Sequence, residues 1–211
     1  MPVDTSDMLA VHAVLRDACL GAVRLVDSVA PGDDDRLALV AWYFANILAL
    51  LQAHHDAEDV LLWPPLLERV SDPAPVTRVA AQHAALDPVL EAVERRLADW
   101  AASPTAQRGR SLAAAFTALG RALGRHLDDE ESNVLPLAAE HLTEQEWAEL
   151  PAHAMAGFTG DRAWLVLGLV RARLTEAQAA AQLAAMPASA REFWLTVGRP
   201  QYEAFVTTLL G

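Results

Sequence analysis

The sequence predicts an all-α protein: an antiparallel four-helix bundle of two repeated helical hairpins, followed by a C-terminal helical extension. Apolar residues recur at intervals of three and four along almost the whole chain, and runs of alternating β-branched residues are absent. Prolines and glycines divide the first 141 residues into four long segments with short connections, which antiparallel packing accommodates economically. With 211 residues, 53% of them hydrophobic, the chain can bury a sizeable core.

Four long helices are expected in residues 1–141, the predicted bundle domain. Ser6 or Asp7 should cap the first helix, and Pro64 and Pro136 should end the second and the fourth. Pro88 lies inside the third helix, where it removes one backbone hydrogen bond and should bend the helix. The expected helices cover about residues 7–29, 33–63, 75–101 and 107–135.

Residues 142–211 are expected to form the helical extension, packed on the bundle. Its helix starts resemble capping boxes, in which a Thr or Ser and a Glu or Gln three residues later satisfy free backbone N–H groups. Its aromatic residues are expected to serve packing. The three predicted boxes are Thr143 with Glu146, Thr175 with Gln178, and Ser189 with Glu192.

Charge and composition exclude several classes of partner and site. A net charge of −12 without a Lys/Arg cluster argues against nucleic acid and anionic membranes. The most apolar stretch, residues 37–51, is interrupted by Asn46 and runs into charged residues, which favours a buried helix over a membrane span. The N-terminus lacks a basic leader, so we expect an unprocessed, cytoplasmic protein. Cys19 is the only cysteine, so a core thiol is expected and no intramolecular disulfide can form.

An internal repeat carries the most distinctive polar residues. VHAVLRD at 11–17 matches QHAALDP at 82–88, 71 residues later, and HHDAEDVLLWP at 54–64 matches HLDDEESNVLP at 126–136, 72 residues later. Each half therefore supplies one histidine on its first helix and a His-x-x-x-Glu motif on its second. The six repeated residues are His12, His54, Glu58, His83, His126 and Glu130.

Helix geometry directs these six side chains into the core. Residues four apart share a helix face, so His54 lies on the face of Glu58, as His126 does on that of Glu130. Leucine and valine residues flank the histidines on all four helices. A single histidine on such a face is usually a hydrogen-bonded core residue, but two matching sets favour another explanation. Unpaired buried imidazoles and carboxylates are costly, and a bound metal would compensate them.

The donor set suits a pair of metal ions. Histidine nitrogen with carboxylate oxygen suits Fe, Zn, Mn or Cu, and the two hairpins provide roughly three ligands per ion. The simplest arrangement bridges two ions by Glu58 and Glu130. The histidines would then divide into His12 and His54 at one ion, and His83 and His126 at the other.

Two further residues are possible ligands, and each has an alternative role. His55 lies about 100° around the helix from His54, and its repeat counterpart is Leu127. It is either a fifth histidine ligand or a boundary residue bonded to a nearby acid. Asp87 shares a face with the third-helix histidine, and it forms either a metal contact or an ion pair with Arg16.

The other polar residues near the repeat are expected to stay outside the site. Asp59 and Glu131 point about 140° away from the ligand face, so they should be solvated or salt-bridged. His141 and His153 lie outside the repeat and should be ordinary surface or helix-cap groups. Tyr43 shares the ligand face but lies about 16 Å along the helix, so it should belong to the core.

The pattern His…His-x-x-x-Glu…His…His-x-x-x-Glu, with helix ends reading EDVLLWPPL and EESNVLPL, resembles the hemerythrin-like HHE cation-binding domains over residues 9 to about 141. The resemblance implies a four-helix bundle around two iron ions, bridged by an oxo or hydroxo group, that react with O2, H2O2 or NO. Zn or Mn could substitute for iron. The ending EFWLTVGRPQYEAFVTTLLG is similar to the C-terminal extension of bacterial stand-alone members.

The chain departs from the oxygen-carrying members of that family. Those have a second histidine one turn after the first on the third helix, where this chain has Asp87, and a longer His-to-Asp spacing on the fourth. A site poorer in imidazole and richer in carboxylate favours redox turnover or sensing over simple oxygen carriage. The chain also resembles the iron-sensing module of an F-box ubiquitin-ligase subunit, in which the residue matching His55 contributes a ligand.

The sequence therefore predicts a non-heme di-iron protein of oxidoreductase type, or one that removes peroxide or NO, with an unidentified reductant. Two alternatives remain open. One is a non-catalytic protein that binds or senses oxygen or iron. The other is a dedicated di-iron oxidase of a specialised pathway, in which the extension forms part of a substrate pocket.

Overall fold

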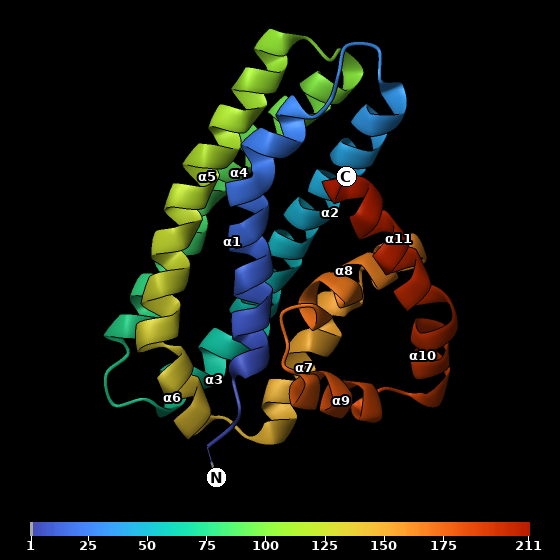
Figure 1. Ribbon diagram of the computed structural model, residues 1–211. Helices are drawn as coiled ribbons and strands as arrows, with labels where there is room; N and C mark the ends of the chain where they lie inside the picture. Colours follow the sequence, from blue (N-terminus) through green and yellow to red (C-terminus); the bar gives the residue numbers. More distant parts are fainter. Residues whose placement is uncertain (1) are drawn as a thin grey trace.

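Four long helices stand side by side as a bundle in the computed structural model, which describes residues 2–211 (Figure 1). No strand occurs among these residues, so the predicted all-α class is confirmed. The fourth long helix packs against both the first and the third. The four are α1 (Ser6–Asp27), α2 (Asp34–Ala57), α4 (Ala74–Ala102) and α5 (Ala106–Asn133).

The start of α1 differs from the predicted cap. Thr5 occupies the cap position, while Ser6 and Asp7 lie in the first turn, so the prediction that one of them caps the helix is wrong. The helix begins earlier because the Asp4 carboxylate accepts the Ser6 N–H at 3.0 Å. The Asp7 carboxylate instead accepts the indole N–H of Trp147, in the extension, at 3.0 Å.

Pro64 does not end the second helix. Helix α2 continues through a π-helical turn, η1 (Glu58–Leu62), into α3 (Trp63–Arg69). The wider turn bonds the N–H of Trp63 to the carbonyl of Glu58, five residues back. Pro64 then takes the second position of α3, where a missing N–H is tolerated. The prediction of a stop at this proline is therefore wrong, because the π-turn accommodates it.

Pro136 also redirects a helix. Helix α5 ends at Asn133, and the N–H of Val134 bonds the carbonyl of Glu130 at 2.8 Å. A new helix, α6 (Leu135–His141), follows at once with Pro136 in its second position. The predicted end of α5 is thus close to the observed one, but the chain does not leave the helical path there.

The upper core of the bundle is aromatic and aliphatic. Phe44 and Phe116 are both 0% exposed, and their ring centroids lie 4.4 Å apart. Tyr43 and Cys19 belong to the same core, as predicted, and burial raises the pKa of the Cys19 thiol to about 12. Pro88 lies inside α4 without breaking it.

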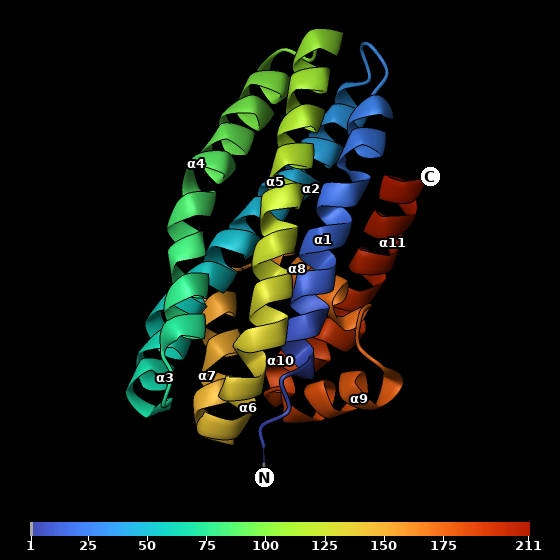
Figure 2. The same ribbon diagram turned by 90° about the vertical axis from the view of Figure 1, so that its left-hand side faces the viewer.

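The extension lies against the α1 and α2 side of the bundle (Figure 1, Figure 2). Thr143 and Thr175 form two of the predicted capping boxes. The third box is wrong, because Pro187 holds the cap position and Ser189 lies inside the helix. The elements are α7 (Glu144–Met155), α8 (Asp161–Arg171), α9 (Glu176–Ala185), α10 (Ala188–Phe193), the π-helical η2 (Trp194–Gly198) and α11 (Arg199–Leu210).

Polar and aromatic contacts fasten the extension to α1 and α2. Arg36 donates to two carbonyls of the last turn of α11, at 2.6 and 2.7 Å, and so satisfies a helix C-terminus. The Trp42 ring lies 5.8 Å from that of Trp164 and 5.2 Å from that of Phe205. The other polar links are Trp147–Asp7, His153–Asp56, Arg162–Asn46, Arg173–Asp17 and Gln178–Ser6.

The continuous helical run Asp34–Arg69 is long and apolar enough to cross a membrane by length and composition alone, with a mean hydropathy of 1.5 in its most apolar window. In the structure 56% of that window is buried inside the protein. A buried core helix passes the same test, and this run packs as one member of the bundle.

Removing an aromatic ring from the core should cost much of the stability. We expect Phe116→Ala to lower the free energy of unfolding by about 3–5 kcal/mol, because it leaves a cavity opposite Phe44. The matched surface change Leu20→Ala, at a residue that is 80% exposed, should stay within about 0.5 kcal/mol. Urea unfolding followed by circular dichroism measures both, and similar losses would contradict the assigned core.

Candidate metal centre

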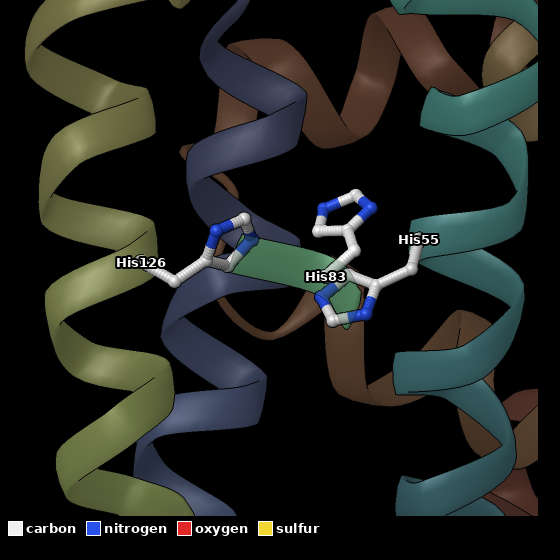
Figure 3. Close-up of side chains that lie close together, drawn as sticks. All are labelled: His55, His83 and His126. Atoms are coloured by element: carbon white, nitrogen blue, oxygen red, sulfur yellow. The ribbon is translucent and has the colours of Figure 1, made fainter. Parts of the chain in front are cut away.

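Seven buried side chains meet in the lower half of the bundle core. All six residues of the repeated motif are among them, and His55 is the seventh. They form two groups, in each of which one ligand atom per residue lies within 4.8 Å of all the others. Figure 3 shows the rings of the first group, from α2, α4 and α5, pointing toward one another. The groups are His55, His83 and His126, and His12, His54, Glu58 and Glu130.

The two carboxylates lie between histidines of both groups. Glu58 Oε1 is 3.4 Å from His54 Nε2, and its Oε2 is 3.3 Å from His83 Nε2. Each carboxylate therefore has the position of a bridge between two adjoining sites. The corresponding distances from Glu130 Oε2 are 3.4 Å to His12 Nε2 and 3.8 Å to His126 Nε2.

These separations fit the edges of a metal coordination polyhedron. Bonds of about 2.0–2.2 Å from a metal to nitrogen and oxygen place neighbouring ligand atoms about 3.0–3.5 Å apart. The nitrogen-to-oxygen distances in the centre run from 3.3 to 3.8 Å, longer than ordinary hydrogen bonds. The inward atoms are thus spaced like ligands that share ions.

The inward-facing donor atoms have no hydrogen-bond partners. Among residues 2–211, nine buried side-chain nitrogen and oxygen atoms lack one, and all nine belong to the seven residues of the centre. At about 1–3 kcal/mol each, they would offset most or all of the roughly 5–15 kcal/mol by which a protein domain is stable. Imidazole nitrogen and carboxylate oxygen are ligands of iron, zinc and manganese, so these residues fit bound metal.

Hydrogen bonds hold the outer ring nitrogens of three histidines. His12 Nδ1 donates to Glu131 Oε1 at 2.8 Å, and His83 Nδ1 donates to Asp59 Oδ1 at 2.8 Å. Because an ionised carboxylate only accepts, these contacts place the proton on Nδ1 and leave the lone pair of Nε2 facing inward, as metal binding requires. The third such contact joins His126 Nδ1 and Gln82 Oε1 at 3.1 Å.

The two acids that orient these rings reach across between the hairpins. Asp59 follows Glu58 directly yet holds the third-helix histidine, and its repeat counterpart Glu131 holds the first-helix one. Arg16 pairs with Glu131 at 2.5 Å, and the Trp63 indole donates to Asp59 at 2.8 Å. The prediction of solvated or salt-bridged acids missed this role, although an acid after each motif glutamate was a signal. On a straight helix both acids point away from the ligand face, and their partners on the adjacent helices are seen only in the folded structure.

The structure places His55 in the centre and not at its boundary. Its side chain is buried, and its ring stacks on that of His83 with centroids 4.0 Å apart and planes 16° apart. The π-turn that begins at Glu58 shifts the buried face of this helical run, so that Leu62 is fully buried and Leu61 is only half-buried. The counterpart of His55, Leu127, is fully buried, so the repeat is asymmetric at this position.

Asp87 is not brought to the centre. It is exposed and belongs to neither ligand group. The predicted ion pair with Arg16 is wrong, because α1 packs against α5, where Arg16 pairs with Asp128 at 2.6 Å and with Glu131. His153, predicted as a surface group, is partly exposed and pairs with Asp56 at 2.7 Å.

Burial controls the protonation of the centre in the absence of a cation. Burial, assisted by the neighbouring imidazoles, lowers the pKa of His54 well below its ordinary value, that of His55 to about 2 and that of His126 to about 3. Burial also raises the pKa of Glu58 well above its usual range, with the facing Glu130 adding to the effect, and burial raises the pKa of Glu130. A bound cation would favour the ionised carboxylates, so metal binding should release protons.

A family model described as the hemerythrin HHE cation binding domain matches residues 3–138. The matched range contains all seven residues of the centre and ends within α6. No curated protein and no solved structure matches the chain.

Acid should destabilise the metal-free protein in two stages. Below about pH 6.5 the unfolded chain protonates its histidines while His54, His55 and His126 stay neutral in the fold. Each of these histidines lowers the free energy of unfolding by about 1.4 kcal/mol for every unit by which the pH falls. Glu58 and Glu130 oppose this loss down to about pH 4.5, because the folded state holds their protons first. Urea titrations should show unfolding free energy falling slowly from pH 6.5 to 4.5 and steeply below.

The variant His55→Leu isolates one contribution, since leucine occupies the buried counterpart position in the second hairpin. It should flatten the slope between pH 4.5 and 3 by about 1.4 kcal/mol per pH unit. An unchanged slope would mean that His55 is not held neutral in the core.

Proposed function

The chain belongs to the hemerythrin HHE cation-binding domain family, and on that premise we propose that it is a non-heme di-iron protein whose centre reacts with O2, H2O2 or NO. The convergence of nine unpartnered buried donor atoms on one spot carries the proposal. Two adjoining ligand groups with carboxylates between them support two ions instead of one. Iron accepts both imidazole and carboxylate donors in its two common oxidation states. Zinc accepts the same donors but has only one oxidation state, so it offers no redox chemistry.

The side chains divide naturally between two ions. The group with three imidazoles would hold one ion and the group with two imidazoles the other, while the carboxylates are shared. The assigned ligands are His55, His83 and His126 for one ion, His12 and His54 for the other, and Glu58 and Glu130 for both.

When bound, iron would supply electron exchange and a coordination position for a small oxidant. The protein's own residues prepare that position. Asp59 and Glu131 keep Nδ1 of their histidines protonated and the rings aligned. Arg16 lies behind Glu131 and holds its carboxylate in the accepting, ionised form, since the bond from His12 and the contact with Arg16 lower its pKa to about 2.

The surroundings of the centre limit water. Leu50, Leu86 and Leu123 are each no more than 3% exposed, and they belong to the apolar core above the ligand groups. Such a lining admits apolar gases more readily than ions or water. A cytoplasmic location and an unidentified reductant that resets the centre complete the proposal.

Reversible oxygen binding without turnover is the second candidate. The sequence argument against it was a shortage of imidazole, and His55 raises the number of histidines in the centre to five. The two candidates differ in the fate of the oxidant. A stable, reversible oxygen adduct with no loss of peroxide would favour binding, and rapid consumption of H2O2 or NO would favour turnover.

Purified protein reconstituted with ferrous iron should hold two iron ions per chain and consume H2O2, with a change in near-ultraviolet absorption on oxidation. Glu58→Ala should lose at least one ion per chain, because it removes a carboxylate from both groups. The control Glu91→Ala changes an exposed acid of α4 and should behave as wild type. Metal quantification and absorption spectra measure both. Protein that still holds stoichiometric zinc after iron loading, and that consumes no peroxide, would refute the di-iron proposal.

The contact behind His12 should also tune metal affinity. Glu131→Ala removes the acceptor from its Nδ1 and should weaken metal binding about 10–100-fold. Glu131→Gln keeps an acceptor, so its metal affinity should lie between that of Glu131→Ala and that of the wild type. Asp128→Ala is the matched control, because Asp128 also pairs with Arg16 but contacts no residue of the centre. Competition with a chromogenic chelator measures the affinities, and equal effects of the two alanine variants would argue against an orienting role.

A further inference from the structure

The two halves of the centre are covered differently, although the repeat relates them. Beside His126, a polar cluster of α4 and α5 closes the surface. The Gln82 amide oxygen faces His126 Nδ1 at 3.1 Å, and its nitrogen donates to Asp129 at 2.9 Å. Arg78 pairs with the same Asp129 at 2.7 Å. Side chains of the bundle alone therefore cover this side.

The other hairpin cannot form this cluster. Two of the three counterpart positions carry side chains without polar atoms, and the third carries an acid that binds Trp147 of the extension. The bundle thus presents a largely apolar face beside His54, and α7 and α8 cover it. The repeat offsets of 71 and 72 residues relate Arg78, Gln82 and Asp129 to Asp7, Val11 and Ala57.

A cavity of about 110 Å³ lies at this contact between bundle and extension. All three counterparts of the polar cluster line it, together with His54 of the centre. Besides Asp7, His54 and the Trp147 indole, the lining contains one polar side chain, Gln182 of α9, so the walls are mostly apolar. The apolar lining includes Met8, Leu50, Leu150, Met155, Val166 and Val170.

We propose that this cavity binds a small, uncharged, largely apolar organic molecule, with the bulk of a six-membered carbon ring, directly beside His54. An aliphatic cavity of roughly 150 Å³ takes up benzene, and this one is of similar size, with a rim that includes the exposed Pro151. The inference deepens the proposed function by naming the class of molecule that would meet the centre. The inference rests on the proposed function only in that His54 is taken to bind a metal.

The chemistry of the walls selects this class of ligand. Burying an apolar molecule among methionine, leucine and valine side chains removes its surface from water, which is the main favourable contribution. An anion would meet the Asp7 carboxylate in a chain of net charge −12. A cation would find that carboxylate already bonded to Trp147 and no second acid in the lining. Helices α7 and α8 supply much of the wall, which gives the extension a role in recognition.

Calorimetric titration of the full-length, cobalt-loaded protein with benzene tests the proposal, with benzoate as the charged analogue. We expect saturable benzene binding with a Kd of about 1 mM or tighter, and binding of benzoate at least tenfold weaker. Because His54 lines the cavity and belongs to a ligand group, benzene should also shift the visible absorption of the bound cobalt.

Variants that fill the cavity locate the binding. Ala154→Phe, from α7, places a ring in the cavity and should weaken benzene binding at least tenfold, whereas Ala152→Phe, on the exposed face of the same helix, should not. Val170→Phe blocks the cavity from α8 and provides a second variant should the first fail to fold. Circular dichroism and thermal melting establish that each variant is folded.

The outcomes separate this inference from the proposed function. Metal-loaded protein without saturable benzene binding, or folded Phe variants that bind benzene like wild type, would overturn the inference and leave the di-iron proposal standing. Unshifted cobalt absorption on benzene binding would overturn the placement beside His54. Benzene binding to protein that takes up no metal would support the cavity and refute the proposed function.

Discussion

The burial of five imidazoles and two carboxylates without protein partners for their inward atoms is the constraint on which the rest of this structure depends. Left alone, these atoms would offset the stability of an ordinary domain, since each costs about 1–3 kcal/mol. The surrounding residues are arranged to hold them in place: the outer nitrogens of three rings are tied to acceptors, and leucines exclude water above them. Bound cations would turn the same unfavourable atoms into ligands, which couples the stability of the bundle to metal binding.

The repeat explains how seven residues from distant parts of the chain reach one place. Each hairpin orients the first-helix histidine of the other, through Asp59 to His83 and through Glu131 to His12. The hairpins are therefore joined by reciprocal contacts as well as by packed leucines. Their support differs, because a tryptophan backs Asp59 while Arg16 backs Glu131.

The departures from the repeat lie where a distinct chemistry is expected. His55 adds an imidazole to one group only, the π-turn follows in the same hairpin, and two of the three counterparts of the polar cluster around Gln82 are apolar there. The extension packs against α1 and α2, the two helices of that hairpin, and the cavity lies at this contact. The asymmetric half of the bundle is thus the half to which the extension adds walls.

The sequence by itself determined the all-α class, the four long helices and the six repeated metal-centre candidates, because helical periodicity and a 71–72-residue repeat are properties of the chain alone. Only the tertiary structure decided the roles of residues whose direction depends on a neighbouring helix. His55 lies 100° from the ligand face and enters the centre through packing against α4, whereas Asp87 lies on a favourable face and stays outside. Asp59 and Glu131 point away from the ligand face of their own helical segments, and each accepts a hydrogen bond from a histidine of the other hairpin. The π-turn at Glu58–Leu62 and the cavity beside His54 are likewise seen only in the structure, because helical periodicity does not separate an α-turn from a π-turn and the cavity walls come from helices far apart in the sequence.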